Sequence, residues 1–527
     1  MTSRLARSAG LIGAATMTSR VLGVVRETVF AALFGAGNAM DAFNVAFRIP
    51  NLLRDLLGEG AMSAAFVPAF TRRLLRAGRG EAWRLGNVVI NAVAMLTIVV
   101  VVVGWLIAPA LVRAIAPQYA SVPGKLPLTI TLTRILLPFL LAVAVSAAFM
   151  GMLNSLRRFF VPALSPAMFN VATIASAFIL VPLAARAGWP PITGIAIGAL
   201  LGGVGQVLLQ WPVLRGEGWR YRPVFDWRDD GLREILMLVG PGTLGLAAVQ
   251  VNVFVNTMLA TGEGTGAVSW LNYAFRLVHL PIGLFGASIA TAALPEFARH
   301  AASADLPAVR KTVSSAMRLM LMMNVPAAVG LIVLARPVVA LVLEHGQFSA
   351  ADTAATAGAL MWYAPGLIGY SAVKIASPGF YALGNARTPV AASVIAIVAN
   401  LVLNVTLVRV MGYRGLAAGT SAAALLNAAM LLWQLRGTLQ GLEGRRMLRA
   451  FAGIAIASIA MGAAAWSMNA WLEAVLPGAA TLLRGVRVLA AITAGLLVLA
   501  AAARLLRIDE FQYAMRQALA RLTPSAG

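Results

Sequence analysis

Long apolar runs separated by short polar connections cover nearly the whole chain. A run of about twenty apolar residues is long enough to cross a bilayer as a helix. Counted in this way, the chain is predicted to be an all-α polytopic membrane protein with fourteen transmembrane helices. Their approximate cores are 9–34, 40–70, 87–108, 129–153, 161–185, 192–213, 234–260, 266–296, 314–335, 353–383, 390–411, 415–435, 447–470 and 486–504.

The composition agrees with a membrane protein. Of the 527 residues, 60% are hydrophobic and 12% are charged, whereas soluble domains are about 45–50% apolar and about 25% charged. The net charge of +23 does not indicate a nucleic-acid-binding protein, because the cations lie in short loops between apolar runs rather than on one basic helix or tail. The chain has no cysteine, which excludes disulfides and thiolate chemistry.

The basic residues are distributed unevenly between the two sides of the predicted membrane. With the N-terminus inside, the inner loops hold roughly three times as many Lys and Arg residues as the outer loops. The first apolar run follows Arg4 and Arg7 as a signal peptide would, but it also contains Arg20 and Arg26, so we interpret it as a retained span. Both termini are therefore expected in the cytoplasm.

An internal repeat relates the two halves of the chain. Three short motifs recur about 227 residues later: 46–49 as 274–277, 68–72 as 295–299, and 151–154 as 379–382. Because six predicted spans separate the equivalents, both halves cross the membrane in the same direction. This predicts two six-helix lobes related by a pseudo-two-fold axis along the membrane normal, a plan typical of transporters. The expected boundaries are 1–222 for the first lobe, 223–440 for the second, and 441–527 for two C-terminal helices and a short tail.

Charged residues recur inside the first two apolar runs and in the eighth. A charge near the bilayer centre costs about 2.5–3.5 kcal/mol on insertion scales, so such groups are expected to face water, a partner charge or a charged substrate. Arg20 and Arg26 diverge by about 120° on a straight helix, and Gly23 between them offers a place to bend. We predict that Arg20, Arg26 and Arg276 converge on one polar cavity and bind a phosphate or pyrophosphate.

Further polar residues share helix faces with these arginines, mostly at intervals of seven or four. Substrate contacts are predicted at Arg20, Arg26, Arg276, Ser19, Ser269 and Asn272. Gating or structural ion-pair roles are predicted for Glu27, Asp41, Arg48, Arg54 and Glu59. The plainer alternative, in which these charges only form structural ion pairs or extend to the membrane surface, stays open, as does a structural role for Lys374. No spacing typical of a metal site or a catalytic centre is found, so we expect neither a metal nor an enzyme.

Several motifs resemble those of the MurJ (MviN) family of lipid II flippases. They are Ser19-Arg20-Val21-Leu22-Gly23, 34–37, 41–43, 50–54, 59–61 and 65–68, and then Ser269-Trp270 with Tyr273 and Arg276, 378–381 and Thr388-Pro389. The resemblance runs from the first predicted span to the last. It implies the fold of the multidrug/oligosaccharidyl-lipid/polysaccharide exporter superfamily, in which two extra C-terminal helices help to form a groove for a lipid tail.

The resemblance also implies a function. The chain would move lipid II, an undecaprenyl-pyrophosphate-linked peptidoglycan precursor, from the cytoplasmic to the periplasmic leaflet of the bacterial inner membrane, by alternating access through a cationic central cavity. The family's functional positions fall on Arg20, Arg26, Arg276, Ser19, Ser269, Asp41 and Arg54. Four positions depart from the family pattern: Glu27 replaces an Asp, Asp55 an Arg, Phe275 an acid, and His279 an acid. These departures leave the pairing of charges and any ion coupling open.

Other functions remain to be weighed. The alternative within the superfamily is a flippase for another undecaprenyl-linked oligosaccharide or a multidrug antiporter. A membrane enzyme that uses polyprenyl-phosphate donors is disfavoured, because the outer loops are short and have few acids. A non-transporting scaffold for cell-wall assembly is the third possibility.

No cofactor is expected, and coupling to the membrane potential or a monovalent cation stays open. The expected partners are lipid II and membrane lipids, with the cell-wall synthesis machinery as a further candidate and no nucleic acid.

Overall fold

The apolar runs fold into helices in the part of the chain that the computed structural model describes, residues 2–57, 61–303 and 305–512. Side chains at 2–12, 14, 55–57, 61–64, 238–248 and 287 lie outside that description. Over the described residues, all fourteen predicted ranges are helical apart from single turns, and no strand is assigned. The all-helical fold class predicted from the sequence is confirmed.

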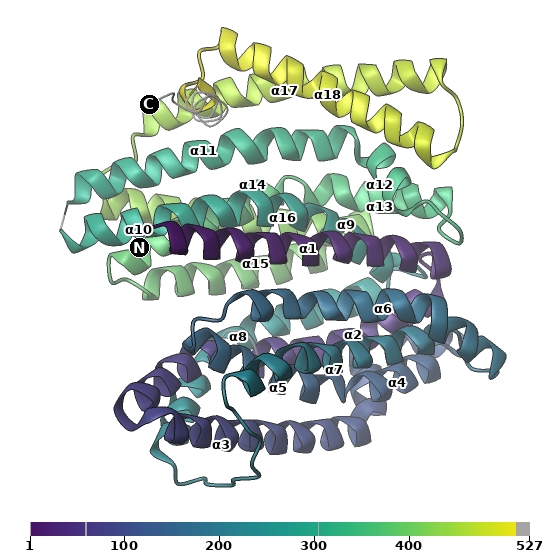
Figure 1. Ribbon diagram of the computed structural model, residues 1–527. Helices are drawn as coiled ribbons and strands as arrows, with labels where there is room; N and C mark the ends of the chain where they lie inside the picture. The colour runs from purple at the N-terminus through teal and green to yellow at the C-terminus, as the bar shows by residue number, and fades with distance from the viewer. Residues whose placement is uncertain (1, 58–60, 304, 513–527) are drawn as a thin grey trace. The chain divides into compact units, whose positions relative to one another are not determined.

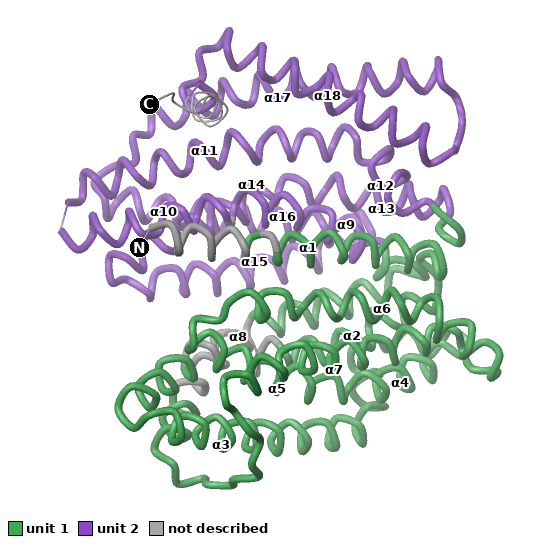
Figure 2. Tube along the Cα trace, in the orientation of Figure 1, with its two compact units in different colours: residues 1–269, 345–348 green, residues 270–344, 349–527 purple. Residues whose placement is uncertain are grey.

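The chain divides into two compact units, which Figure 2 shows in green and purple. Unit 1 consists of residues 1–269 and 345–348, and unit 2 consists of residues 270–344 and 349–527. The elements of unit 1 are α1 (Thr2–Phe34), α2 (Asn38–Leu57), α3 (Ala61–Ile115), the 3₁₀ turn η1 (Pro117–Ser121), α4 (Lys125–Leu136), α5 (Phe139–Ser155), α6 (Phe160–Arg186), α7 (Ile192–Gly216) and α8 (Asp230–Thr261).

Helix α9 (Ala267–Pro281) begins in unit 1 and continues into unit 2. The other elements of unit 2 are the π-helical turn η2 (Ile282–Gly286), α10 (Ala287–Ala302), α11 (Leu306–Val333), α12 (Ala335–Leu343), α13 (Ala350–Tyr363), α14 (Gly366–Ala382), α15 (Arg387–Met411), α16 (Tyr413–Thr438), α17 (Gly444–Val475) and α18 (Thr481–Leu505). Because α8 packs along α3 and α2, the contacts place it in unit 1. The predicted lobe boundary at residues 222–223 lies before this helix, and the six-helix repeat stays a prediction.

Ten helical segments of the described chain are long and apolar enough to cross a membrane. They are Ala65–Ile115, Lys125–Ser155, Phe160–Arg186, Ile192–Gly216, Ala267–Ala302, Leu306–Val333, Arg387–Met411, Tyr413–Thr438, Gly444–Val475 and Thr481–Leu505. The chain is therefore a multi-pass membrane protein. The count of fourteen spans stays a prediction.

Proline divides two of the predicted spans, and a glycine divides the long helix α3. The span predicted at 129–153 is two helices, α4 and α5, which meet at Pro138. In the same way α13 and α14 meet at Pro365. Proline has no N–H group to continue the hydrogen-bond ladder. Gly78 has φ 80° and ψ −179°, so α3 is two helices joined at this residue. Pro50 lies inside α2, which continues to Leu57.

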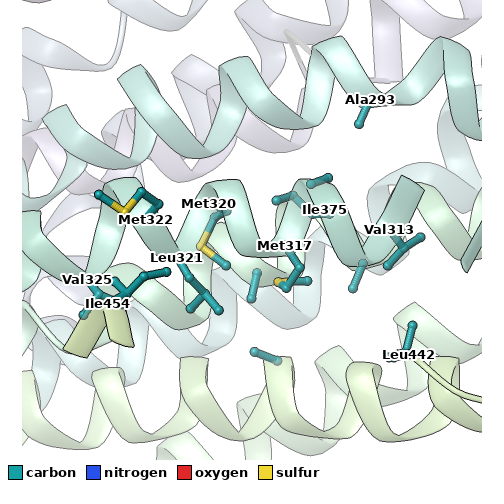
Figure 3. Close-up of a cluster of buried hydrophobic side chains, with 14 of the residues drawn as sticks. Ala293, Val313, Met317, Met320, Leu321, Met322, Val325, Ile375, Leu442 and Ile454 are labelled. Atoms are coloured by element: carbon teal, nitrogen blue, oxygen red, sulfur yellow. The ribbon is translucent and has the colours of Figure 1, made fainter. Parts of the chain in front are cut away.

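A methionine-rich core holds unit 2 together. Figure 3 shows Met317, Met320 and Met322 of α11 beside Ile375 of α14 and Ile454 of α17. Methionine is flexible and fills irregular gaps between helices. Because α14 and α17 both contact α11, this core attaches the C-terminal pair α17 and α18, which pack side by side (Figure 1), to the rest of unit 2.

A buried arginine fastens the start of α17 to α11. The side chain of Arg318 is 6% exposed and donates to Glu443 at 3.0 Å and to Glu510 at 2.5 Å. The hydroxyl of Ser314 donates to the same Glu443 carboxylate at 3.1 Å. Glu443 directly precedes α17, and Glu510 follows α18, so one guanidinium holds both ends of the C-terminal helix pair.

Acidification is expected to loosen this attachment. Burial raises the pKa of Glu443, but the hydrogen bonds from Arg318 and Ser314 and the charge of Arg446 outweigh burial, so the pKa lies below its ordinary value. Such a carboxylate stabilises the fold above its unfolded pKa, and that contribution is lost as the pH falls through the folded pKa. The unfolding midpoint in detergent should therefore fall less steeply for Glu443→Gln than for the unmodified chain between about pH 6 and pH 3. Glu473→Gln, at an exposed acid, should keep the original slope. Equal slopes for all three proteins would contradict this role of Glu443.

Candidate functional site

Arg26 is enclosed between α1 and α6 in unit 1. It is 5% exposed. Its Nη2 donates to Glu27 at 2.5 Å, and its Nη1 donates to the Asn170 carbonyl oxygen at 3.0 Å. The rings of Phe30 and Phe169 have their centroids 5.7 and 5.1 Å from the guanidinium carbon. The charge of Arg26 is thus neutralised and its side chain held in place, an arrangement typical of a buried structural ion pair with cation–π support.

Arg20, less than two turns earlier on α1, has a different environment. It is half-buried, and no carboxylate among the described residues lies within ion-pair distance of it. Helix α6 contacts the backbone beside it, because the Asn170 amide donates to the Ser19 carbonyl at 2.9 Å. Glu27, seven residues after Arg20, pairs with its own neighbour Arg26. Of the two predicted α1 cations, Arg20 is therefore the one available to an anionic ligand.

Asp41 is the centre of a second buried cluster in unit 1. It lies in the first turn of α2 and is 0% exposed. Its carboxylate accepts from Lys125 Nζ of α4 at 2.9 Å, from the backbone N–H groups of Gly266 and Ser269 at 2.8 and 3.1 Å, and from the Ser269 hydroxyl at 2.7 Å. Asn44 also donates to the Ser269 hydroxyl, at 3.2 Å. The carboxylate is therefore paired with a cation and hydrogen-bonded, as a buried charge must be.

This cluster gives α9 its N-terminal cap. The first N–H groups of a helix have no partner within the helix, and a carboxylate near that end interacts favourably with the helix dipole. Here the carboxylate comes from a different helix, α2, and binds the backbone of Gly266 and Ser269. Ser269 is the last residue of unit 1 before the chain continues into unit 2. Asp41 therefore fixes the segment at which the chain leaves unit 1.

Lys125 was missed as a site residue by the sequence analysis. It is 3% exposed, and its ammonium group lies 4.1 Å from the centroid of the Tyr119 ring. Burial, and then the charge of Asp41, raise the pKa of the Tyr119 phenol well above its ordinary value, so the phenol stays neutral. In the described chain the Tyr119 hydroxyl has no hydrogen-bond partner. One sequence signal was available: Lys125 is one of only three lysines in a chain with 39 arginines.

In unit 2, Arg276 lies on α9, seven residues after Ser269, and is exposed. Two of the departures from the family pattern, Phe275 and His279, lie beside it. Phe275 and His279 have ring centroids 4.1 Å apart, and Tyr363 packs on Phe275 at 5.2 Å. The Nδ1 atom of His279 lies 3.1 Å from the Phe275 carbonyl oxygen. At the two positions where the resemblance implies acids, this chain thus has an aromatic group.

The other predicted residues are placed as follows. Asn272 is half-buried on α9, and Arg48 and Arg54 are half-buried on α2. Glu59 lies outside the described residues. Lys374 is exposed on α14. The predicted convergence of Arg20, Arg26 and Arg276 combines residues of both units and stays a prediction. No group of three or more His, Asp and Glu side chains suited to a metal ion occurs in the part of the chain that the structure describes.

Comparisons with known proteins identify the class. A solved structure titled "Inward-facing conformation of a multidrug resistance MATE family transporter of the MOP superfamily" matches with a TM-score of 0.68 over 83% of this chain and 99% of that one, at 16% identity. This match establishes the fold, that of a polytopic helical membrane protein. A second solved structure, "Lipid II flippase MurJ, inward closed conformation", matches with a TM-score of 0.77 and 25% identity over 94% of this chain and 99% of that one.

The sequence comparisons identify the family. The family model described as "Lipid II flippase MurJ" matches residues 30–483. A Vibrio cholerae protein named "Probable lipid II flippase MurJ" is 34% identical over 90% of this chain and 91% of its own length. The Burkholderia cenocepacia "Lipid II flippase MurJ" is 34% identical over 80% of this chain and 82% of its own length. The chain belongs to the MurJ family.

Proposed function

We propose that this protein is a lipid II flippase of the bacterial inner membrane, with both termini in the cytoplasm. The observation that carries the proposal is the family match over residues 30–483, together with relatives that are named lipid II flippases. The orientation rests on the excess of basic residues in the loops on the side of the N-terminus. The function requires no bond to be made or broken, so neither a catalytic residue nor a cofactor is needed.

In the proposed mechanism the chain alternates between states of similar energy that open a cationic central cavity to either leaflet. Arg20 would bind the pyrophosphate, because no carboxylate among the described residues neutralises its charge. Arg276 would supply a second cation from α9. Since the Asp41 cluster caps the start of α9, it would set the position from which Arg276 acts. The undecaprenyl tail would stay in the membrane lipid throughout, and the membrane potential or a monovalent cation would bias the cycle.

The proposal is tested by depleting the protein from growing cells and measuring lipid II separately in the two leaflets. We expect lipid II to accumulate in the cytoplasmic leaflet and to disappear from the periplasmic leaflet before the cells lyse. A cell that lacks the protein and still delivers lipid II to the outer leaflet at the normal rate would exclude it as the main flippase. The same cells report on a role with the cell-wall synthesis machinery, because a pure scaffold would leave the leaflet distribution unchanged.

A further inference from the structure

Unit 2 contains a cavity of about 410 Å³ at the end of the α17–α18 hairpin. In Figure 1 this end of the hairpin lies beside α12 and α13, and α18 contacts α12 directly. The charged residues of the lining are Arg336, Glu344, Glu473, Arg484 and Arg487. The cavity is remote in sequence from the residues assigned to substrate transport, and every residue of its lining belongs to unit 2.

One of the three arginines serves the fold. Arg484 Nη2 donates to the Glu344 carboxylate at 2.7 Å, and Nη1 donates to the carbonyl oxygens of Ala340 and Glu344 at 3.2 Å. The opposite charges of Arg484 and Glu344 cancel, and the pair connects the start of α18 to the end of α12. It therefore forms part of the cavity wall without adding net charge to it.

The other two arginines retain their charge. Arg487 is 8% exposed, yet its one hydrogen bond within the described chain runs from Nη2 to the Gly478 carbonyl at 2.6 Å. Nε and Nη1 of this buried guanidinium thus remain available where it lines the cavity. Arg336 is exposed and pairs with no described carboxylate. The lining also contains Glu473, a carboxylate that has no ion pair among the residues that the structure describes.

Helix α18 adds to the positive potential. It begins at Thr481, next to the cavity, and no side chain caps its first N–H groups. A helix N-terminus favours an anion, and guanidinium groups bind phosphate oxygens with paired N–H donors. A buried cation that is only partly hydrogen-bonded needs water or a ligand to complete its bonds. Arg487, 8% exposed and with one hydrogen bond in the described chain, supplies donors for such an anion.

We propose that this cavity binds a phosphate group, with Arg487 and Arg336 as its ligands. The source is either the headgroup of a membrane phospholipid or free phosphate, since both present the same oxygens. Arg487 provides the fixed donor and Arg336 closes on the ligand from the exposed side. Glu473 opposes binding by charge repulsion. Such a ligand would join α12 to the α17–α18 hairpin, and its binding is independent of the transport function.

Native mass spectrometry of the purified, delipidated full chain tests the proposal. Phosphatidylglycerol and diacylglycerol with the same acyl chains are titrated separately. Inorganic phosphate is tested by its effect on the thermal unfolding midpoint at constant ionic strength. We expect phosphatidylglycerol to bind at least about tenfold more tightly than diacylglycerol, because charge-assisted hydrogen bonds are lost without the phosphate. If phosphate alone raises the midpoint and the phospholipid does not bind, free phosphate is the ligand.

Four variants separate this site from general membrane affinity. Arg487→Gln should weaken binding at least about tenfold and Arg336→Gln about threefold, whereas Glu473→Gln should strengthen it about twofold. Arg409→Gln, at an exposed arginine of α15 outside the cavity, should leave the affinity unchanged. Arg336 makes no ion pair or side-chain hydrogen bond within the described residues, so its variant gives a result even if Arg487→Gln does not fold. Equal affinities for Arg336→Gln and Arg409→Gln, or no phosphate-dependent binding to the unmodified chain, would overturn the proposal.

Discussion

Replacing Lys125 with methionine is expected to destabilise unit 1 by about 3–5 kcal/mol, because it leaves a fully buried carboxylate without its cation. Asp41 is 0% exposed and Lys125 is 3% exposed, so water cannot take over the lost interaction without opening the packing of α2 against α4. Methionine preserves most of the volume and apolar contact of the lysine side chain. The measurement is the free energy of unfolding of the purified protein in detergent.

Two controls make this expectation specific. Lys311→Met, at an exposed lysine of α11 that has no ion pair in the described chain, should change stability by less than about 0.5 kcal/mol. The double variant Asp41→Asn/Lys125→Met should be more stable than Lys125→Met alone, because with both charges removed no buried carboxylate lacks a cation. A Lys125→Met protein as stable as Lys311→Met would show that the pair does not support the fold.

Replacing Arg20 with glutamine is expected to reduce lipid II transport at least about tenfold, while leaving stability within about 0.5 kcal/mol. The proposed contact to the pyrophosphate is a charge-assisted hydrogen bond, which is worth about 1.5–3 kcal/mol. No carboxylate among the described residues pairs with Arg20, so no buried acid is left behind. Transport is measured as the rate at which lipid II reaches the outer leaflet of cells that depend on the variant.

Arg26→Gln should behave differently from Arg20→Gln. Its removal takes the Arg26 charge away from Glu27, whose side chain is 9% exposed, so loss of transport should come with loss of stability. Arg409→Gln should retain both properties. A stable Arg20→Gln protein that transports lipid II at the normal rate would remove Arg20 from the substrate site.

The helices themselves could be predicted from the sequence, because apolar length is a direct requirement of the bilayer. The breaks inside them were harder to predict. Pro50 lies within a continuous α2, whereas Pro138 and Pro365 separate helices. A proline removes one N–H in every case, and tertiary packing decides whether the helix continues. Likewise α8 belongs to unit 1 because of its contacts with α3, which no repeat in the sequence reveals.

The candidate site could be predicted only in part. Asp41 and Ser269 stand out as polar groups at the ends of apolar runs, and the structure brings them to 2.7 Å. The cation that pairs with Asp41, Lys125, is 84 residues away in the sequence. It lies where a loop meets a helix, and a lysine at such a place ordinarily indicates only how the helix is oriented in the membrane. The sequence spacing does not predict the partner of Arg26 either. Adjacent residues on a helix point about 100° apart, whereas residues seven apart share a face. Spacing alone therefore predicts an ion pair of Glu27 with Arg20 rather than with Arg26. The long Arg26 side chain reaches Glu27 while it also bonds Asn170 of α6.

The central claim is that this chain alone moves lipid II across a bilayer. It is tested most directly with purified protein reconstituted into liposomes that carry labelled lipid II in the inner leaflet, followed by the rate at which the label becomes accessible from outside. We expect a rate well above that of protein-free liposomes for the unmodified chain and for Arg409→Gln, and a rate reduced at least about tenfold for Arg20→Gln. Folded, unmodified protein that exposes lipid II no faster than protein-free liposomes, under every membrane potential and cation gradient applied, would contradict it.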